Sequence, residues 1–213
     1  MTEDEAKTWL KANFDVPRET WARLDGYVQM LLAEMDQQNL IAESTREHVW
    51  SRHIVDSAQL MKLDGTANEG LWIDLGSGAG LPAIVVAILS ERPVLMIESR
   101  RKRIDFLNRL VGELSLNNAD VYGGRVESAP ASEAAVISAR AYAPLDRLLS
   151  SALHLSTDKS LWILPKGRNA QIELEAARSS WQGVFHVERS ITDPESAIII
   201  ARSVAPRGKK GRK

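Results

Sequence analysis

Three glycines at alternate positions constrain this chain more than any other feature of its sequence. Gly76, Gly78 and Gly80 follow a short apolar run at 71–75 and precede a helical apolar run at 83–89. This order predicts a strand, a tight turn and a helix. Because glycine lacks a Cβ atom, such a turn can adopt positive φ, and a ligand can lie against its backbone beside the partial positive charge of the helix N-terminus. We therefore expect a ligand-binding loop at the end of the first strand.

The spacing of these glycines distinguishes between kinds of ligand. A dinucleotide-binding loop has the pattern G-x-G-x-x-G, whose third glycine would fall at Leu81. Instead, Asp74 stands two residues before the first glycine, and the resulting pattern D-x-G-x-G-x-G resembles motif I of the S-adenosylmethionine-dependent methyltransferases. In those enzymes the loop holds the methionine part of the cofactor. A glycine-rich turn in an unrelated strand and helix unit is the alternative.

A second acidic residue supports the cofactor interpretation. The buried run at 94–97 ends on Glu98, about 20 residues after the loop, where such folds place the carboxylate that accepts hydrogen bonds from the ribose hydroxyls. The sequence therefore predicts a site for S-adenosyl-L-methionine. The cofactor-binding residues that this pattern predicts are Asp74, Gly76, Gly78, Gly80 and Glu98.

Composition excludes several classes of protein and of chemistry. With 213 residues, 44% hydrophobic, 26% charged and a net charge of −1, the chain is typical of globular proteins. It has no apolar run near the roughly 20 residues that span a membrane and its first residues are acidic, so we expect a cytoplasmic protein with no membrane partner. Cysteine is absent, which excludes disulfides, thiolate metal sites and methylation at C5 of a pyrimidine, a reaction that needs a cysteine nucleophile. The histidines lack metal-ligand spacing, so no metal is expected.

Apolar runs and helical patterns alternate after residue 70, which indicates right-handed crossovers and a parallel sheet. Two final apolar runs are separated by only a short polar break, which predicts an antiparallel hairpin. By fold analogy we expect an α/β, Rossmann-like class I methyltransferase with a seven-stranded, mostly parallel sheet that ends in this hairpin. The predicted strands are 71–75, 94–98, 119–122, 134–138, 160–164, 184–190 and 197–203, and the predicted helices between them are 81–90, 101–115, 144–155 and 169–181.

The first part of the chain is expected to form a helical extension that packs on the sheet domain. Thr2 and Glu5 predict a capping box for a first helix, and Pro17 suits the first turn of a second. Ser44 and Glu47 repeat the box before a third helical run that continues to residue 61. The predicted organisation is an N-terminal helical extension at 1–66, an S-adenosylmethionine-binding methyltransferase domain at 67–205 and a disordered basic tail at 206–213.

Two basic clusters are candidates for RNA contact. The first falls in the opening turn of a predicted helix, where the helix dipole disfavours cations. RNA phosphate would compensate, and a solvated face is the alternative. The second is the tail, which either attracts phosphate or serves solubility. The candidates are Arg100, Arg101, Lys102 and Arg103 in the first cluster and Arg207, Lys209, Lys210, Arg212 and Lys213 in the tail.

Five collinear segments resemble the bacterial glucose-inhibited division protein B family. They are RHIVDS at 52–57, DLGSGAGLP at 74–82, RVE at 125–127, SARA at 138–141 and KG at 166–167. Members of that family are 16S ribosomal RNA (guanine-N7) methyltransferases, so the resemblance implies methyl transfer from S-adenosylmethionine to N7 of one guanine near the decoding site. It implies 16S ribosomal RNA or a 30S subunit precursor as partner, and we expect a monomer. The family's cofactor contacts carry over to Gly76, Leu81, Val126, Glu127 and Arg140.

The implied chemistry asks little of the protein. Guanine N7 has an in-plane lone pair, so its attack on a methyl sulfonium needs no base, and positioning supplies most of the catalysis. We therefore expect no catalytic histidine or carboxylate pair. Lys166 and Arg140, at the ends of adjacent strands, are candidates for a positioning contact with guanine O6 or with a phosphate. A structural ion pair is the alternative for Arg140, and a structural hydrogen bond is the alternative to an RNA or substrate contact for His53.

Two other functions are compatible with the sequence. A methyltransferase for a small molecule would have a closed apolar pocket and no salt-dependent RNA binding. A non-catalytic RNA-binding assembly factor would keep the cofactor site without turnover, and a change at Gly76 would then leave its activity intact. The two basic clusters favour RNA over a small substrate.

Overall fold

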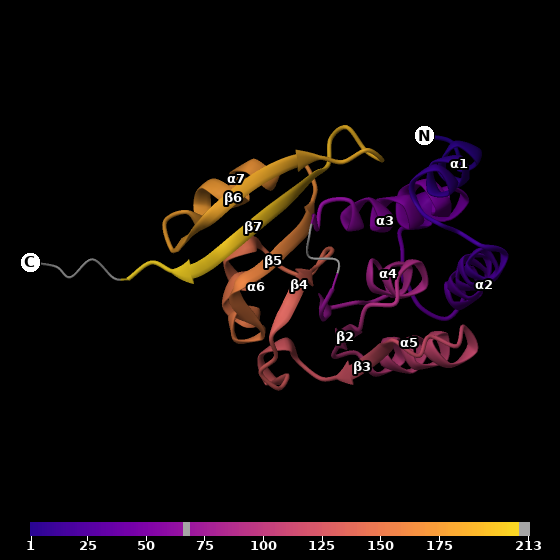
Figure 1. The fold of residues 1–213 in the computed structure, drawn as a ribbon, viewed down its shortest axis with the longest axis horizontal. Coiled ribbons are helices and arrows are strands. Elements are labelled where there is room, and N and C mark those ends of the chain that lie inside the picture. The colour runs from indigo at the N-terminus through magenta and orange to yellow at the C-terminus, as the bar shows by residue number, and fades with distance from the viewer. Residues whose placement is uncertain (66–68, 209–213) are drawn as a thin grey trace, which may run out of the picture.

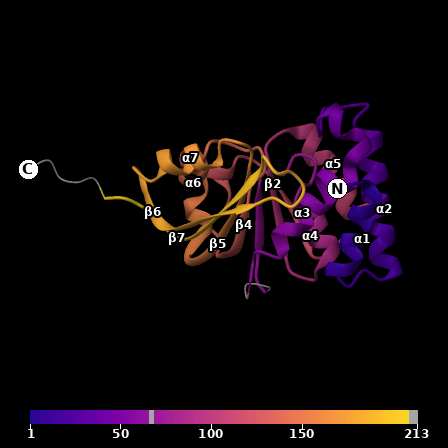
Figure 2. The same ribbon diagram turned by 90° about the horizontal axis from the view of Figure 1, so that it is seen from above.

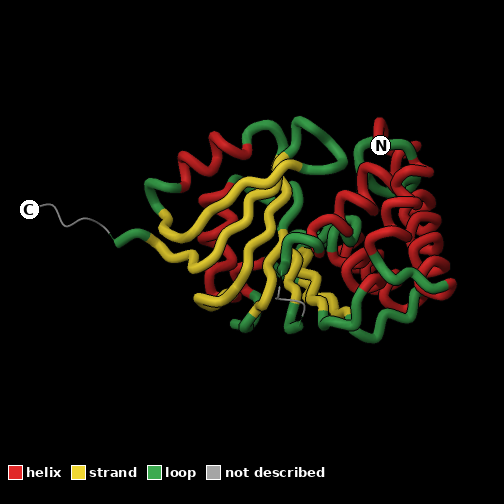
Figure 3. Tube along the Cα trace, turned by 45° about the horizontal axis from the view of Figure 1, so that its top comes forward, coloured by secondary structure: helices red, strands yellow, loops and turns green. Residues whose placement is uncertain are grey.

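A seven-stranded β-sheet runs through the parts of the chain that this computed structural model describes, residues 1–65 and 69–208 (Figure 1). The strands are β1 (Trp72–Leu75), β2 (Val94–Glu98), β3 (Ala119–Gly123), β4 (Ala134–Ser138), β5 (Ser156–Lys166), β6 (Trp181–Arg189) and β7 (Ala197–Pro206). They lie in the order β3-β2-β1-β4-β5-β7-β6. All pairs among β1 to β5 are parallel, whereas β7 is antiparallel to both of its neighbours. The predicted fold class and its terminal hairpin are confirmed, and Figure 3 shows the strands as one twisted sheet.

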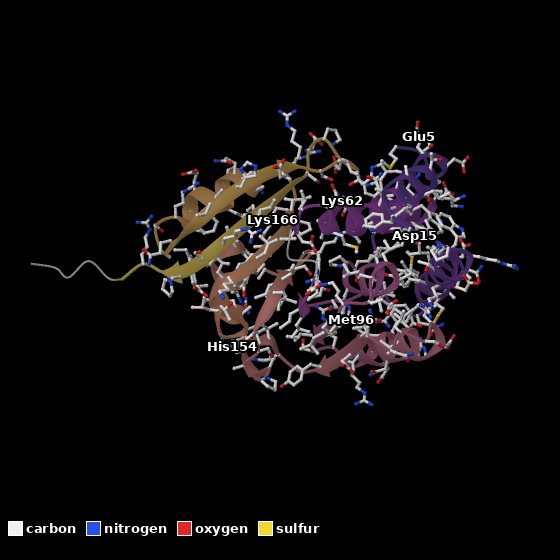
Figure 4. The ribbon with its side chains drawn as sticks, viewed as in Figure 1. Glu5, Asp15, Lys62, Met96, His154 and Lys166 are labelled. Atoms are coloured by element: carbon white, nitrogen blue, oxygen red, sulfur yellow. The ribbon has the colours of Figure 1, made fainter. Side chains whose placement is uncertain are left out.

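Helices cover both faces of the sheet (Figure 2). On one face lie α4 (Ala83–Leu89) and α5 (Arg101–Glu113), and on the other lie α6 (Leu145–Ala152) and α7 (Ala170–Ala177). Short 3₁₀ helices, η3 (Val126–Ser128) and η4 (Leu153–Leu155), complete this part of the chain. The central strands are buried on both faces, as a parallel sheet between two helical layers must be, and Met96 of β2, labelled in Figure 4, is fully buried.

The N-terminal helices extend the layer formed by α4 and α5. They are α1 (Glu3–Asn13), α2 (Arg18–Glu34), η1 (Glu43–His48), η2 (Trp50–Val55) and α3 (Asp56–Met61). Their buried side chains belong to the same apolar core as those of α4 and α5, so the extension packs on the sheet domain as expected. The capping box of Thr2 and Glu5 is confirmed, with both of its hydrogen bonds formed. No helix in the described residues is long and apolar enough to cross a membrane.

The third helical run differs from its prediction. The segment forms a 3₁₀ helix (η1), a π-helical turn (η2) and a short α-helix (α3), and the expected capping box of Ser44 and Glu47 is absent because η1 begins at Glu43 without a side-chain cap. A residue from another helix supplies the cap. The Glu3 carboxylate accepts hydrogen bonds from the backbone N–H groups of Trp50 and Ser51, both at 2.9 Å, and from Ser51 Oγ at 2.7 Å. Sequence patterns do not report such a cap, because its partners are far apart in the chain.

Replacing Glu3 is expected to loosen this junction. The Glu3→Ala variant leaves the first N–H groups of η2 without a partner, and we expect it to lower the free energy of unfolding by about 1–3 kcal/mol. Asp4→Ala is the matched control, because Asp4 lies exposed in the same helical turn and its loss alters the helix dipole interaction in the same way. Urea unfolding of both variants measures the difference. Equal destabilisation by the two changes would show that the cap contributes nothing.

Several further boundaries differ from the prediction, and two of them have a clear cause. Helix α7 ends at Ala177 rather than at 181, because Ser179 and Ser180 are poor helix formers and Trp181 begins β6, where its indole N–H donates to Asp146 Oδ1 at 2.8 Å. The tail was expected to be disordered from residue 206. Instead Pro206 ends β7, and Arg207 donates from its backbone N–H to Ser180 O at 2.7 Å and from Nε to Trp181 O at 3.0 Å. The remaining basic tail residues, Lys209, Lys210, Arg212 and Lys213, lie outside the described residues.

The strand order determines where a ligand can bind. From β1 the chain moves to β2 and β3 on one side and then returns to β4 and β5 on the other. The carboxyl ends of β1 and β4 therefore diverge into a crevice, and ligands of open α/β sheets bind in the crevice at such a switch point. The glycine loop leaves β1 at this edge.

Candidate active site

The glycine loop has the conformation that the sequence predicts. Gly76, Gly78 and Gly80 have φ values of 66°, 55° and 90°. A Cβ atom at residue 80 would lie 2.5 Å from Cγ1 of Ile84, so this glycine allows α4 to pack closely against the loop. A Cβ atom at residue 76 would lie 2.7 Å from the Tyr142 ring. Gly76 therefore keeps open the space between the loop and the segment after β4.

Neighbouring elements hold the loop rigidly. The Tyr27 hydroxyl of α2 donates to Ala79 O at 2.9 Å, and the backbone N–H of Gly78 donates to Glu98 Oε2 at 3.0 Å. The other oxygen of Glu98 accepts from the backbone N–H groups of Ser99 and Arg100, at 2.7 and 2.9 Å. Glu98 thus joins the glycine loop to the start of α5, and it also compensates the unpaired N–H groups at that helix N-terminus.

Asp74 lies beneath the loop. Its side chain is fully buried, Oδ1 accepts from the Ser138 hydroxyl at 2.7 Å, and Oδ2 has no partner in the described residues. Neither Asp74 nor Gly80 borders one of the three clefts described below, because Asp74 is buried beneath the loop and Gly80 packs against Ile84 of α4. Their direct contact with a cofactor stays a prediction. Burial raises the pKa of Asp74 to about 7, against the lowering effect of the hydrogen bond from Ser138.

This raised pKa predicts how stability depends on pH. Because the folded protein binds the Asp74 proton more tightly than the unfolded chain does, the stabilisation is complete below about pH 4 and is lost as the pH rises through about 7. Asp74→Asn cannot titrate, so the free energy of unfolding of the wild type should fall relative to that of the variant by up to about 4 kcal/mol between pH 4 and pH 8. Urea unfolding at several pH values measures this, with Asp120→Asn on exposed β3 as a control for net charge. A difference independent of pH would refute the assignment.

Three clefts meet at the end of β4. The first cleft, of about 420 Å³, lies between the carboxyl ends of β1, β2 and β3, and four predicted cofactor residues line it: Gly76, Glu98, Val126 and Glu127. The second cleft, of about 370 Å³, lies on the other side of the glycine loop and contains Gly78, Leu81, His53 and Arg140. The third, of about 430 Å³, lies between the ends of β4 and β5 and the turn that joins β6 to β7. Ala141 borders all three.

Several residues that line the first cleft were not predicted to lie at the cofactor site. Tyr142 directly follows the segment SARA, and Arg125 is the first residue of the segment RVE, so these segments were an available signal for both. Arg103 lines both the first and second clefts and lies 3.8 Å from Glu98 Oε2. Arg147, on α6, comes from a helix for which no site was predicted.

The four basic side chains at the start of α5 point in different directions. Arg100 and Arg103 border the first cleft, whereas Arg101 is 87% exposed and pairs with Asp105, one turn along the helix. Lys102 is exposed and borders none of the three clefts. The Arg103 side chain turns toward the glycine loop, and contact of the four residues with RNA stays a prediction.

Arg140 and Lys166 both border the third cleft and both have partners. Arg140 lies 3.5 Å from the Asp56 carboxylate and donates to Arg52 O at 3.2 Å. Lys166 ends β5 (Figure 4), and its ammonium donates to Ala143 O and to Glu173, each at 2.8 Å. Parallel β4 and β5 end at the same edge, which brings the two cations to one cleft as expected. Arg140 forms the ion pair that was its alternative role, and it also lines the second cleft.

Charged and apolar residues both line the third cleft, and the sequence analysis left most of it unassigned. Arg52 pairs with Asp193 at 2.9 Å, which ties the N-terminal helices to the turn between β6 and β7. Asp56 also accepts from Thr192 Oγ1 at 2.6 Å across the same junction. Among the described residues, no group of three histidine, aspartate or glutamate side chains is arranged to hold a metal ion.

Known proteins resemble this chain in both sequence and fold. A family model described as "GidB: rRNA small subunit methyltransferase G" matches residues 20–199. The ribosomal RNA small subunit methyltransferase G of Rhizorhabdus wittichii is 54% identical over 217 residues, which cover 100% of this chain and 99% of that protein. The protein of the same name from Sphingopyxis alaskensis is 52% identical over 208 residues, which cover 97% and 89%.

Solved structures agree with this at the level of the fold. A SAM-dependent methyltransferase from Aquifex aeolicus has a TM-score of 0.58 at 11% identity over 81% of this chain and 96% of that one. The ribosomal protein L11 methylase from Lactobacillus delbrueckii has a TM-score of 0.56 at 16% identity over 70% and 79%. These two show the fold, and the family model and the two relatives show more: the chain belongs to the GidB family, the rRNA small subunit methyltransferases G.

Proposed function

We propose that this protein transfers a methyl group from S-adenosyl-L-methionine to N7 of one guanine of 16S ribosomal RNA, as a monomer in the cytoplasm, with the free RNA or a 30S precursor as substrate. One observation carries the proposal: Ala141 borders the clefts on either side of the glycine loop and also the third cleft, which three ion pairs line. A cofactor and an acceptor base bound in them would meet at the end of β4.

The residues of the first two clefts fit this cofactor. The backbone of Gly76 separates the clefts, and a Cβ atom there would fill the space that a ligand needs. In the first cleft Glu98 already accepts three N–H groups and keeps about one lone-pair site, on Oε2, for a ribose hydroxyl. Val126 offers an apolar surface for a base. The second cleft would take the methionine part beside Gly78 and Leu81. When bound, the cofactor supplies a methyl group on a positively charged sulfur.

The acids of the third cleft are arranged as structural partners. Asp56 pairs with Arg140, Asp193 with Arg52, and Glu173 with Lys166. Each of these carboxylates is therefore engaged by a cation of the cleft wall. This supports a reaction in which guanine N7 attacks without deprotonation and the protein acts by positioning. The Lys166 ammonium has three N–H groups and uses two of them for Ala143 O and Glu173. We assign the third to guanine O6.

The character of the third cleft favours RNA over a small apolar acceptor. A methyltransferase for an apolar small molecule would close an apolar pocket over it, but this cleft is walled by three ion pairs. The polar edge of guanine and its attached phosphates can form hydrogen bonds and ion pairs with these charged side chains. We also assign phosphate contact to exposed Arg101 and Lys102 and to the basic residues of the tail, whose attraction to RNA would weaken with salt.

Methyl transfer from labelled S-adenosylmethionine tests the proposal. The acceptors are 16S RNA and 30S subunits that lack the modification, and the labelled base is mapped by borohydride and aniline cleavage, which detects N7-methylguanosine. Label on one guanine is the expected result. If neither acceptor takes label while the protein still binds the cofactor by calorimetry, the ribosomal assignment is wrong and small acceptors are the next to be tested.

A further inference from the structure

His53 lies in the wall of the second cleft with one of its ring nitrogens unused. The side chain is 5% exposed, and the cleft also contains Gly76, Gly78 and Arg140. Nε2 lies 2.7 Å from the Thr45 hydroxyl, whereas Nδ1 is buried and has no partner among the described residues. Buried polar atoms without a partner are rare, so each one needs an explanation.

The neighbours of Thr45 determine which ring nitrogen carries the proton. The Thr45 hydroxyl has a single hydrogen, and it lies 2.7 Å from Ala42 O, which can only accept. The Thr45 hydroxyl must therefore accept the hydrogen bond that joins it to His53. Nε2 of His53 is the donor and carries the hydrogen. Burial, reinforced by Arg140 and Arg52, lowers the pKa of His53 to about 3, so the ring is neutral near pH 7. Nδ1 is then a bare hydrogen-bond acceptor.

A bare acceptor selects a ligand group that donates a hydrogen bond. An anionic group would face the Nδ1 lone pair unfavourably, which excludes carboxylate or phosphate at this point. The methionine part of S-adenosylmethionine has a carboxylate, which accepts, a sulfonium, which neither donates nor accepts, and an α-ammonium, which donates. Of these, the α-ammonium alone matches a neutral imidazole nitrogen.

We propose that Nδ1 of His53 accepts a hydrogen bond from the α-ammonium group of the cofactor, and that the bond from Nε2 to Thr45 holds the ring in the required tautomer. This rests on the cofactor assignment of the proposed function but not on its RNA substrate. His53 is then a cofactor-binding residue rather than an RNA contact, and the segment RHIVDS contributes to the cofactor site through it.

Calorimetry with two matched ligands tests the hydrogen bond without turnover. S-adenosylhomocysteine carries the α-ammonium, and its deamino analogue, with hydrogen in place of the amino group, keeps the carboxylate and the adenosine. We expect His53→Leu to weaken binding of S-adenosylhomocysteine about tenfold or more and to change the affinity for the deamino analogue by less than about threefold. His53→Asn, whose amide oxygen lies near the position of Nδ1, should recover part of the loss.

The other outcomes are decisive as well. Equal losses for both ligands, or no loss for either, would overturn the contact while leaving the cofactor site and the RNA assignment intact. Should His53→Leu not fold, the comparison of the wild type with His53→Asn decides, because the wild type must prefer S-adenosylhomocysteine over the deamino analogue by a similar factor. A wild type that binds the two ligands equally would refute the proposal, and a wild type that binds neither would overturn the cofactor assignment with it.

Discussion

The Gly76→Ala variant is expected to lose cofactor binding by about 100-fold or more while it keeps its fold. Alanine in the left-handed conformation of residue 76 costs about 1 kcal/mol, and its Cβ atom would lie 2.7 Å from the ring of Tyr142. The ring must then move into the first cleft, where the cofactor would lie. A 100-fold loss corresponds to about 3 kcal/mol of binding free energy. Calorimetric titration with S-adenosylhomocysteine measures it directly.

Gly112→Ala is the matched control for this change. Residue 112 lies within α5, and a Cβ atom there meets nothing within 4 Å, so this substitution should raise stability by about 0.5–1 kcal/mol and leave cofactor affinity unchanged. If Gly76→Ala binds the cofactor as tightly as the wild type does, the ligand does not lie between the loop and Tyr142. If binding is lost but the protein's role in ribosome assembly is kept, the chain is a non-catalytic assembly factor.

Removal of the Arg140 charge is expected to reduce methyl transfer by about 100-fold or more. Arg140 lines the second and third clefts and is fixed by Asp56 and the carbonyl of Arg52, so it lies where cofactor and base would meet. A small displacement of reacting groups costs a factor of about 100 in rate. The Arg140→Met variant keeps most of the apolar side chain but lacks the guanidinium. Steady-state methylation of 30S subunits, together with calorimetry of the cofactor, measures the effect on each step.

Two comparisons separate a role in the reaction from a role in the fold. Arg178→Met removes an exposed charge that pairs with Glu175 and borders none of the three clefts, and we expect less than about a threefold change in rate. Arg140→Lys keeps the charge but not the two-pronged geometry, and it should recover only part of the activity. A purely structural ion pair would instead lower the thermal midpoint of Arg140→Met without changing kcat/KM at a temperature where the variant is folded.

Much of the fold follows from local patterns. Short apolar runs bounded by glycine and polar residues mark the central strands, because a strand between two helical layers is buried on both faces. The positive φ values at Gly76, Gly78 and Gly80 follow from the absence of Cβ, and the position of Glu98 follows from the length of a strand and helix unit. These features depend on neighbours within about 25 residues, so the sequence is sufficient to predict them.

Short sequence segments also predicted most of the residues that border the clefts. The loop glycines, Leu81, Glu98, Val126 and Glu127 come from short collinear segments, and the structure places all of them except Gly80 at the clefts. Asp74 belongs to the same motif but lies beneath it, because motif membership does not say which way a strand residue points. For Asp74 that direction decides between contacting a ligand and supporting the loop, and it has a large effect on the pKa.

Tertiary structure alone decided the contacts between distant segments. Glu3 caps η2 nearly 50 residues away, Arg52 meets Asp193 across the third cleft, and the tautomer of His53 depends on what Thr45 contacts. The sequence by itself determined the sheet, the cofactor loop and the family, because each of these is written in residues that are close together in the chain. Which polar atoms pair and which remain free for a ligand depends on distances between separate elements, and only the folded packing sets those distances.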